Sequence, residues 1–304
     1  MKKGYGTCPA TCGELVQGYS NKTECISSYC IDVFSRAIVT EGAGMSNKYT
    51  KNKKKSVEAI GQVLDFFDID RSWMDKLSLS IRSNIPTGKG MASSTADIGA
   101  SIMAILDYLG EDMEPNLISK MVANIEPTDS IYNENICIFD PVKGQVVDEL
   151  GRLNIKKVLI LEPAFKINTV RLRMRQDYYR CLSENKELTS QAFKKLKYGV
   201  ENDNMESIRQ ACETSALANE NIKSTPYLRE LIELARDCNY GFLNISHTGS
   251  VVGIGLDTGT DIDRLVYEIR NSEISKIYKR QYVKKVIDGG LRRRWPGGLY
   301  KKSR

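Results

Sequence analysis

The segment Ile85-Pro86-Thr87-Gly88-Lys89-Gly90-Met91-Ala92-Ser93-Ser94-Thr95-Ala96 decides how this chain is interpreted. Residues 77–82 precede it with alternating apolar side chains, which predict a strand. Apolar residues at spacings of three and four follow it, from Ile98 to Leu109, and predict a helix. The sequence therefore predicts a glycine-rich loop between a strand and the first turn of a helix.

Such a loop is suited to binding phosphate. The first turn of a helix has free backbone N–H groups and carries the positive end of the helix dipole. Gly88 and Gly90 allow the backbone to approach an anion and to direct its N–H groups toward it. The alternative is an ordinary turn that leads into a helix capped by Ser93 or Ser94.

Two common phosphate loops do not fit this segment. A P-loop requires Ser or Thr directly after its Lys, whereas Gly90 follows Lys89. The dinucleotide fingerprint requires an acidic residue about 20 positions further on, at the end of a second strand. The acidic residue near that distance, Asp107, lies inside the predicted helix. The remaining pattern, P-x-x-x-G-Φ-x-S-S with Φ apolar, resembles the ATP loop of the GHMP kinases.

Three further segments resemble motifs of this family, in the same order along the chain. They are Cys8-Pro-Ala-Thr-Cys-Gly-Glu-Leu-Val-Gln-Gly18, Ile125-Glu-Pro-Thr-Asp-Ser130 and Ser246-His-Thr-Gly-Ser-Val-Val-Gly253. The first two resemble in particular the L-threonine kinase branch of the family. The third is less rich in glycine than the family motif.

The fold class expected is α+β, because strands and helices alternate in both halves of the chain. The resemblance implies a GHMP kinase-like fold, with an N-terminal ribosomal-S5-like domain, a C-terminal ferredoxin-like domain and an active site between them. We expect these domains at residues 1–155 and 156–290, followed by a basic flexible tail at 291–304.

Phosphoryl transfer requires a cradle for the nucleotide phosphates, a divalent cation and a group near the acceptor hydroxyl. The resemblance implies that ATP is bound by Pro86, Gly88, Lys89, Gly90, Met91, Ala92, Ser93 and Ser94. It implies Mg²⁺ ligands at Ser93, Ser94 and Glu126, whose oxygen atoms suit this ion. It implies substrate contacts from Thr11, Gly13, Glu14, Gln17, His247, Thr248 and Gly249.

The resemblance also makes Asp129 the catalytic residue, acting as base on the acceptor hydroxyl. The alternatives are structural: Asp129 as a turn residue, His247 as a hydrogen-bonding group, and Glu14 within a hydrogen-bond network. The function implied is an ATP-dependent kinase that converts L-threonine to O-phospho-L-threonine for the aminopropanol linker of cobalamin. Homoserine kinase, or another small-molecule GHMP kinase, is the alternative.

A nucleic-acid-binding S5-like protein is the alternative from another class, and it would use the basic tail. The net charge is +6, and residues 291–304 hold six basic and no acidic side chains. The rest of the chain has balanced charge, and we interpret the tail as solvated and nucleic acid as an unlikely partner. We interpret the basic run Lys51–Lys55 as an exposed loop.

Composition sets the remaining expectations. No apolar run long enough for a membrane span and no signal peptide are present, so we expect a cytoplasmic protein without membrane contact. The eight cysteines lack the spacing and the His partners of a zinc site, so we expect reduced thiols.

Overall fold

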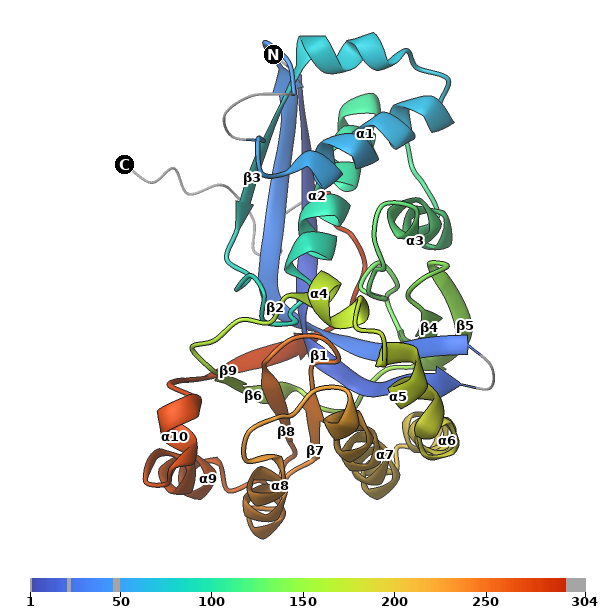
Figure 1. The fold of residues 1–304 in the computed structure, drawn as a ribbon. Coiled ribbons are helices and arrows are strands. Elements are labelled where there is room, and N and C mark those ends of the chain that lie inside the picture. Colours follow the sequence, from blue (N-terminus) through green and yellow to red (C-terminus); the bar gives the residue numbers. More distant parts are fainter. Residues whose placement is uncertain (1, 21–22, 46–49, 294–304) are drawn as a thin grey trace.

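The structure is a computed structural model that describes residues 2–20, 23–45 and 50–293 (Figure 1). The strands are β1 (Lys3–Ser20), β2 (Thr23–Glu41), β3 (Leu77–Ser83), β4 (Ile136–Asp140), β5 (Gln145–Gly151), β6 (Lys157–Glu162), β7 (Phe242–Ile245), β8 (Val252–Leu256) and β9 (Arg280–Ile287). The helices are α1 (Lys54–Phe66), α2 (Ser93–Leu109), α3 (Pro115–Ala123), α4 (Thr169–Arg173), α5 (Tyr178–Glu184), α6 (Lys186–Glu201), α7 (Met205–Ala218), α8 (Leu228–Asp237), α9 (Ile262–Arg270) and α10 (Ile274–Ile277). Two 3₁₀ turns lie at Arg71–Lys76 and Asn219–Asn221.

The nine strands of the described residues belong to one sheet, and six of them form a closed circuit of pairings. The circuit runs β1-β7-β8-β6-β9-β2, and β2 pairs again with β1. Strand β3 pairs with one end of β2, and the β4–β5 hairpin extends from the other end. The sheet therefore continues through both halves of the chain, with β9 from the second half between β6 and β2.

Strands β1 and β2 are much longer than the others and form an antiparallel ribbon that runs from the top of the molecule to its middle, where it bends to the side (Figure 1). The register of β1 against β2 shifts between Pro9 and Ala10, between Thr11 and Glu14, and between Glu14 and Val16. Such irregularities bend a strand and redirect its side chains. They fall within the motif from Cys8 to Gly18, so this motif lies in an irregular part of a strand.

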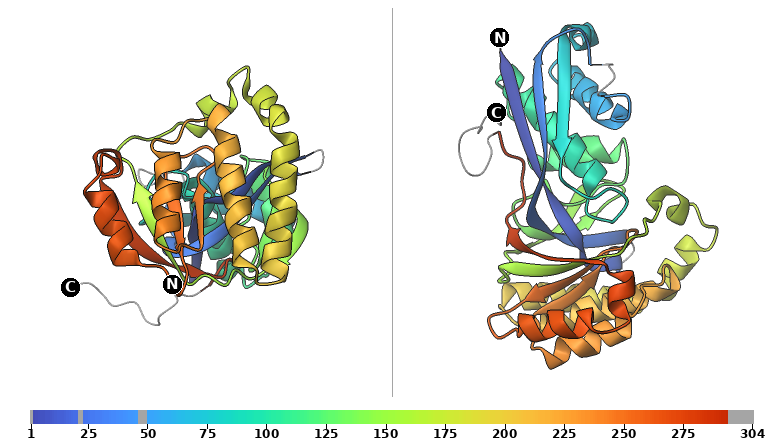
Figure 2. Two further views of the ribbon diagram at one scale, coloured as in Figure 1. Left: turned by 90° about the horizontal axis from the view of Figure 1, so that it is seen from below. Right: turned by 90° about the vertical axis from the view of Figure 1, so that its left-hand side faces the viewer.

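Helix α2 packs on the upper part of the β1–β2 ribbon, between the ribbon and α1 (Figure 1). The sequence predicts an amphipathic stripe, but α2 is buried on almost every side from Thr95 to Leu106. Helices α6, α7, α8 and α9 form a layer under the lower part of the sheet, which Figure 2 shows from below. The apolar core accordingly has one large cluster around α2 and a second around α8 and α9.

Most of the predicted elements are confirmed, including the strand before the glycine-rich loop and the helix after it. The short helices α4, α5 and α10 were not predicted, since four to seven residues carry little periodic signal. The domain division near residue 155 stays a prediction. No helix in the described part of the chain combines the length and apolar character that a membrane span needs.

The basic tail begins with ordered contacts. Arg292 pairs through its backbone with Thr7, and its guanidinium lies over the ring of Phe34. Arg293 forms an ion pair with Asp112. The other four basic residues of the predicted tail lie outside the described residues. All eight cysteines are buried and free, in agreement with the expectation of reduced thiols.

Candidate active site

One cavity of about 480 Å³ brings together segments from all four sequence motifs. Strand β1 contributes Glu14 to the lining of the cavity, and the segment after α3 contributes Glu126 and Asp129. The glycine-rich loop contributes most of its residues between 86 and 95. His247 and Thr248 come from the loop between β7 and β8. Motifs separated by more than 200 residues in sequence therefore share one cavity.

The glycine-rich loop is fixed by its carbonyl groups. All five carbonyls from Gly88 to Ala92 accept backbone hydrogen bonds. Gly88 accepts from Ile167, Lys89 from Ser250 and Val251, Gly90 from Gly13, Met91 from Thr11, and Ala92 from Ala96. In contrast, the amides of Gly90, Met91 and Ala92 donate no hydrogen bond to any described residue. Because these residues line the cavity, the loop presents free N–H groups there next to the N-terminus of α2.

The backbone angles of the loop explain this arrangement. Gly88, Gly90 and Ala92 have φ of 71°, 77° and 56°, so every second residue is in the left-handed region. Alternation of this kind turns successive N–H groups toward one concave side and forms an anion-binding nest. Ala92 adopts this conformation without being glycine, which costs about 1–2 kcal/mol. Neither Ser93 nor Ser94 caps the helix, because the N-cap residue is Ala92.

Gly90 is required by packing against another loop. A Cβ on Gly90 would lie 1.6 Å from Ser246 Oγ and 2.8 Å from Gly249 Cα. A Cβ on Gly249 would meet the backbone of Gly90 at 2.3 Å. The two glycines therefore allow the glycine-rich loop and the β7–β8 loop to touch backbone to backbone.

Lys89 does not line the cavity. Its side chain is buried, and Nζ donates to the carbonyls of Pro163, Ala164 and Phe165. The sequence-based prediction gives Lys89 an electrostatic role toward ATP phosphates. In the structure its ammonium group instead fixes the segment after β6 against the loop.

The predicted metal ligands come together at the start of α2. Ser94 Oγ donates a hydrogen bond of 2.5 Å to Glu126 Oε1, and Ser93 lines the same cavity. The other carboxylate oxygen of Glu126 forms an ion pair with Lys55. A hydroxyl and a carboxylate suit Mg²⁺, which keeps several waters and needs few protein ligands. No group of three or more His, Cys, Asp or Glu side chains with metal-site geometry occurs among the described residues.

Glu14 and Asp129 are two further carboxylates that line the cavity. Burial raises the pKa of Glu14, and the charge of Asp129 raises it further. Burial also raises the pKa of Asp129, with a contribution from Glu126. Asp129 Oδ2 lies 3.5 Å from the hydroxyl of Thr95, and Glu14 Oε2 accepts from the amide of His247 at 2.6 Å. A positively charged ligand group would relieve the repulsion between the two carboxylates.

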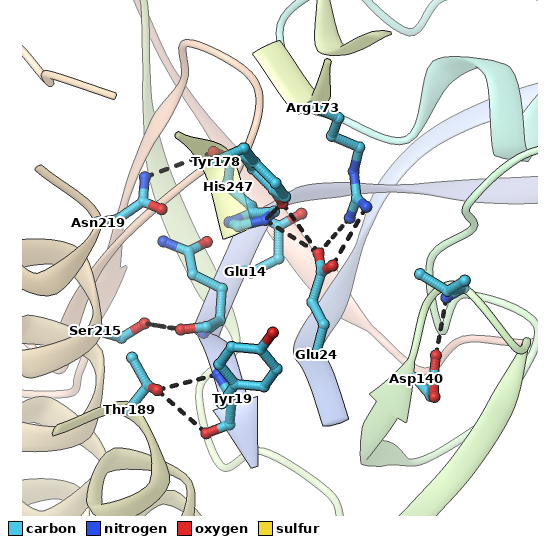
Figure 3. Close-up of polar contacts among 12 residues, drawn as sticks. Glu14, Tyr19, Glu24, Asp140, Arg173, Tyr178, Thr189, Ser215, Asn219 and His247 are labelled. Atoms are coloured by element: carbon cyan, nitrogen blue, oxygen red, sulfur yellow. Dashed lines mark hydrogen bonds and ion pairs between the residues drawn. The ribbon is translucent and has the colours of Figure 1, made fainter. Parts of the chain in front are cut away.

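A network of four side chains supports this region (Figure 3). Arg173 and Glu24 form a mostly buried ion pair, and the hydroxyl of Tyr178 donates to Glu24 at 3.1 Å. His247 Nε2 lies 2.6 Å from the same hydroxyl. His247 Nε2 also lies 3.4 Å from Glu24 Oε1. Glu14, Asp129, Arg173 and His247 line the cavity, and Glu24 pairs with two of them. We call these five residues the acceptor wall.

Charge in the network is held mainly by Glu24 and Arg173. Burial raises the pKa of Glu24, but the hydrogen bond and charge of His247 and the charge of Arg173 outweigh it and lower the pKa to about 2. Burial lowers the pKa of His247 below its usual value, although Glu24 opposes this effect. At neutral pH His247 is therefore uncharged, and Arg173 is the permanent positive partner of Glu24.

Several predicted substrate residues support the site without lining the cavity. The amides of Thr11 and Gly13 hold the loop carbonyls, and Gly249 packs on Gly90. Gln17 is buried, and its backbone N–H donates a hydrogen bond to Ser215 Oγ. Of the predicted substrate residues, Glu14, His247 and Thr248 line the cavity.

Sequence reasoning missed Glu24, Arg173 and Tyr178. Arg173 and Tyr178 lie on or next to short helices without a recognisable motif. Glu24 is the second residue of β2, and this strand contains other polar and charged residues, so the sequence offers no signal for it either.

Residues 55–135 match the family described as GHMP kinases N terminal domain, a range that contains α1 from its second residue, the loop, α2 and α3. The structure also resembles a crystal structure of homoserine kinase from Cytophaga hutchinsonii, with a TM-score of 0.71 and 14% identity over 96% of this chain and 97% of that one. The chain therefore contains a GHMP kinase N-terminal domain and has an α+β fold similar to that of the homoserine kinase, as the sequence predicts.

Two relatives that align with nearly the whole chain carry the name of a particular kinase. The L-threonine kinase of Salmonella typhimurium is 29% identical over 291 residues, covering 94% of each chain. The L-threonine kinase of Citrobacter freundii is 26% identical over 290 residues, covering 93% of this chain and 97% of the relative. The protein is thus a kinase of the GHMP type that resembles L-threonine kinases over nearly its whole length.

Proposed function

We propose that this kinase transfers the γ-phosphoryl group of ATP to the side-chain hydroxyl of L-threonine. The product would be O-phospho-L-threonine, which the resemblance assigns to synthesis of the cobalamin linker. The observation that carries the proposal is that two chemically different sets of groups line one cavity. Backbone amides without a partner among the described residues, which suit phosphate, line the same cavity as two carboxylates that suit an ammonium group.

The loop would hold the nucleotide phosphates through the amides of Gly90, Met91 and Ala92 and the N-terminus of α2. Ser94 and Glu126 would hold Mg²⁺, with Ser93 beside them. When bound, this ion would neutralise phosphate charge during transfer.

The acceptor wall would orient an amino acid. Glu14 would face its ammonium group, which stabilises the charged carboxylate that burial disfavours. Asp129 would accept the hydroxyl proton while the acceptor oxygen bonds to the γ-phosphorus and the bond to ADP breaks. A raised pKa makes a carboxylate more basic, which suits this role.

The test is an ADP-release assay over a panel of acceptors. We expect L-threonine to stimulate ADP release most, L-serine less and L-homoserine least, with ATP and Mg²⁺ present and with EDTA as a control. A preference for homoserine would reject the threonine assignment and retain the kinase. Stimulation by alcohols without an ammonium group would reject the role of Glu14.

A further inference from the structure

A second hollow adjoins the cavity and shares its boundary. It measures about 440 Å³ and is lined by residues 51–56, by Thr87 and Gly88, and by the start of α2. Lys55, Gly88, Ser93 and Ser94 line both hollows. These four residues mark the junction through which a nucleotide extending across both hollows would pass.

Lys55 is the cationic side chain at this junction. It lies in the first turn of α1, and about half of its side chain is exposed. Its ammonium group pairs with Glu126 Oε2, while Ser94 occupies Oε1. Both oxygens of the proposed metal ligand are therefore engaged in this structure, one of them by a positive charge.

Lys89 cannot supply a mobile charge to the same place. Three carbonyl groups hold its ammonium group inside the protein, and it lines neither hollow. Lys53, another lysine of the basic run, is paired with buried Asp97. Lys55 alone among these three reaches the junction of the two hollows.

We propose that Lys55 exchanges partners when the nucleotide binds. Its ammonium group moves from Glu126 to the phosphates at the junction, and this exchange exposes Glu126 Oε2 to the divalent cation. A polyphosphate carries more negative charge than one carboxylate, and the lysine stem is long and flexible. The inference rests on the proposed nucleotide site, and it assigns to Lys55 the role that the sequence suggests for Lys89.

The variant Lys55→Met tests the exchange, because the affinity for ATP and the affinity for a divalent cation should change in opposite directions. Binding of ATP in EDTA, measured by calorimetry, should weaken about tenfold or more, since a charge-assisted contact is lost. Binding of Mn²⁺ alone, measured by electron paramagnetic resonance, should strengthen several-fold, since Glu126 loses its competing cation. Lys55→Arg should retain most of the ATP affinity.

Lys120→Met is the matched control, because Lys120 is an exposed lysine of α3 that lines neither hollow. It should match the wild type in both titrations. Thermal melts of all variants should show that the fold is retained, because a partly exposed ion pair contributes little to stability.

Unchanged ATP and Mn²⁺ binding in Lys55→Met would overturn the exchange and leave the kinase proposal standing. A fall in both affinities would also overturn it, since Lys55 would then only support the local structure around Glu126. Failure of the folded wild-type protein to bind ATP at all would instead reject the proposed function on which the exchange rests.

Discussion

The glycine-rich loop and the acceptor wall face the same cavity, but they hold their polar groups by different means. In the loop, five consecutive carbonyls are bonded to other segments and the amides remain available. In the acceptor wall, titratable side chains from β1, β2, α4 and two connecting segments pack against one another. One side is built from backbone geometry and the other from charge balance.

This difference predicts different sensitivities. A backbone site should tolerate changes of side-chain chemistry and fail when a side chain obstructs the close packing. A charge-balanced site should tolerate small changes of shape and fail when one charge is removed. The three substitutions below test these sensitivities in order of decreasing effect on the free energy of unfolding.

Gly90→Val should have the largest effect. The new side chain would overlap Ser246 and Gly249, and valine is strained at the φ of 77°. Overpacking of about 3 kcal/mol and backbone strain of about 1–2 kcal/mol together approach the whole stability of a small domain. We expect a strongly destabilised protein without measurable ATP binding, as judged by urea denaturation and calorimetry.

Gly259→Val is the matched control, since no atom lies within 4 Å of a Cβ at this position. It should retain nearly wild-type stability and ATP binding. A Gly90→Val protein with wild-type stability would show that the two loops separate easily, contrary to a site built on backbone packing.

Glu24→Gln should have the second largest effect. It leaves Arg173 mostly buried without a counter-charge, and removing one partner of such a pair costs about 3 kcal/mol. Because the pKa of Glu24 is lowered to about 2, its contribution is present above the pKa of an unfolded carboxyl and is lost as the pH falls. The difference from wild type in urea denaturation should therefore be full at pH 7 and shrink toward pH 2–3.

Glu273→Gln removes a carboxylate from an exposed ion pair with Lys276 and serves as the control. Its effect should stay below about 1 kcal/mol at every pH. If both variants lost the same free energy of unfolding, the Glu24–Arg173 pair would contribute no more to stability than a surface ion pair.

The same contrast explains what the sequence predicts well. A loop built from backbone geometry requires glycine at fixed, nearby positions, so Gly88 and Gly90 are visible in twelve residues of sequence. Ser94 and Glu126 were predicted through the family motifs, and the structure places them in contact.

The acceptor wall is predicted only in part. Glu14 and Asp129 lie in motifs, but Arg173 meets Glu24 across 149 residues, and no local pattern marks either. Lys89 shows the opposite error: glycines on both sides suggest a phosphate contact, yet the packing of residues 163–165 determines where its ammonium group lies. Long-range charge pairing is a property of the tertiary fold, which a motif does not report.

Asp129→Asn should have the smallest effect on stability, and its sign should be opposite to that of Glu24→Gln. Burial and Glu126 raise the pKa of Asp129, so its stabilising contribution is complete below the unfolded pKa near 3.8 and is lost as the pH rises through the folded value. Asparagine does not titrate. We expect equal stability at pH 4 and a gain of about 1 kcal/mol for the variant at pH 8, a modest gain because Asp129 partly faces the cavity.

The same variant tests whether the wall is built for catalysis at the expense of stability. Loss of a general base should lower turnover with L-threonine about 10²–10⁴-fold while calorimetry shows threonine still bound. Asp75→Asn, at an exposed position, should change neither quantity. A stabilised variant with turnover reduced only a few-fold would mean that Asp129 orients the acceptor and that the hydroxyl proton leaves by another route. A variant that is neither stabilised at pH 8 nor slower would remove Asp129 from the acceptor wall, and the charge balance proposed for that wall would then rest on Glu14, Glu24 and Arg173 alone.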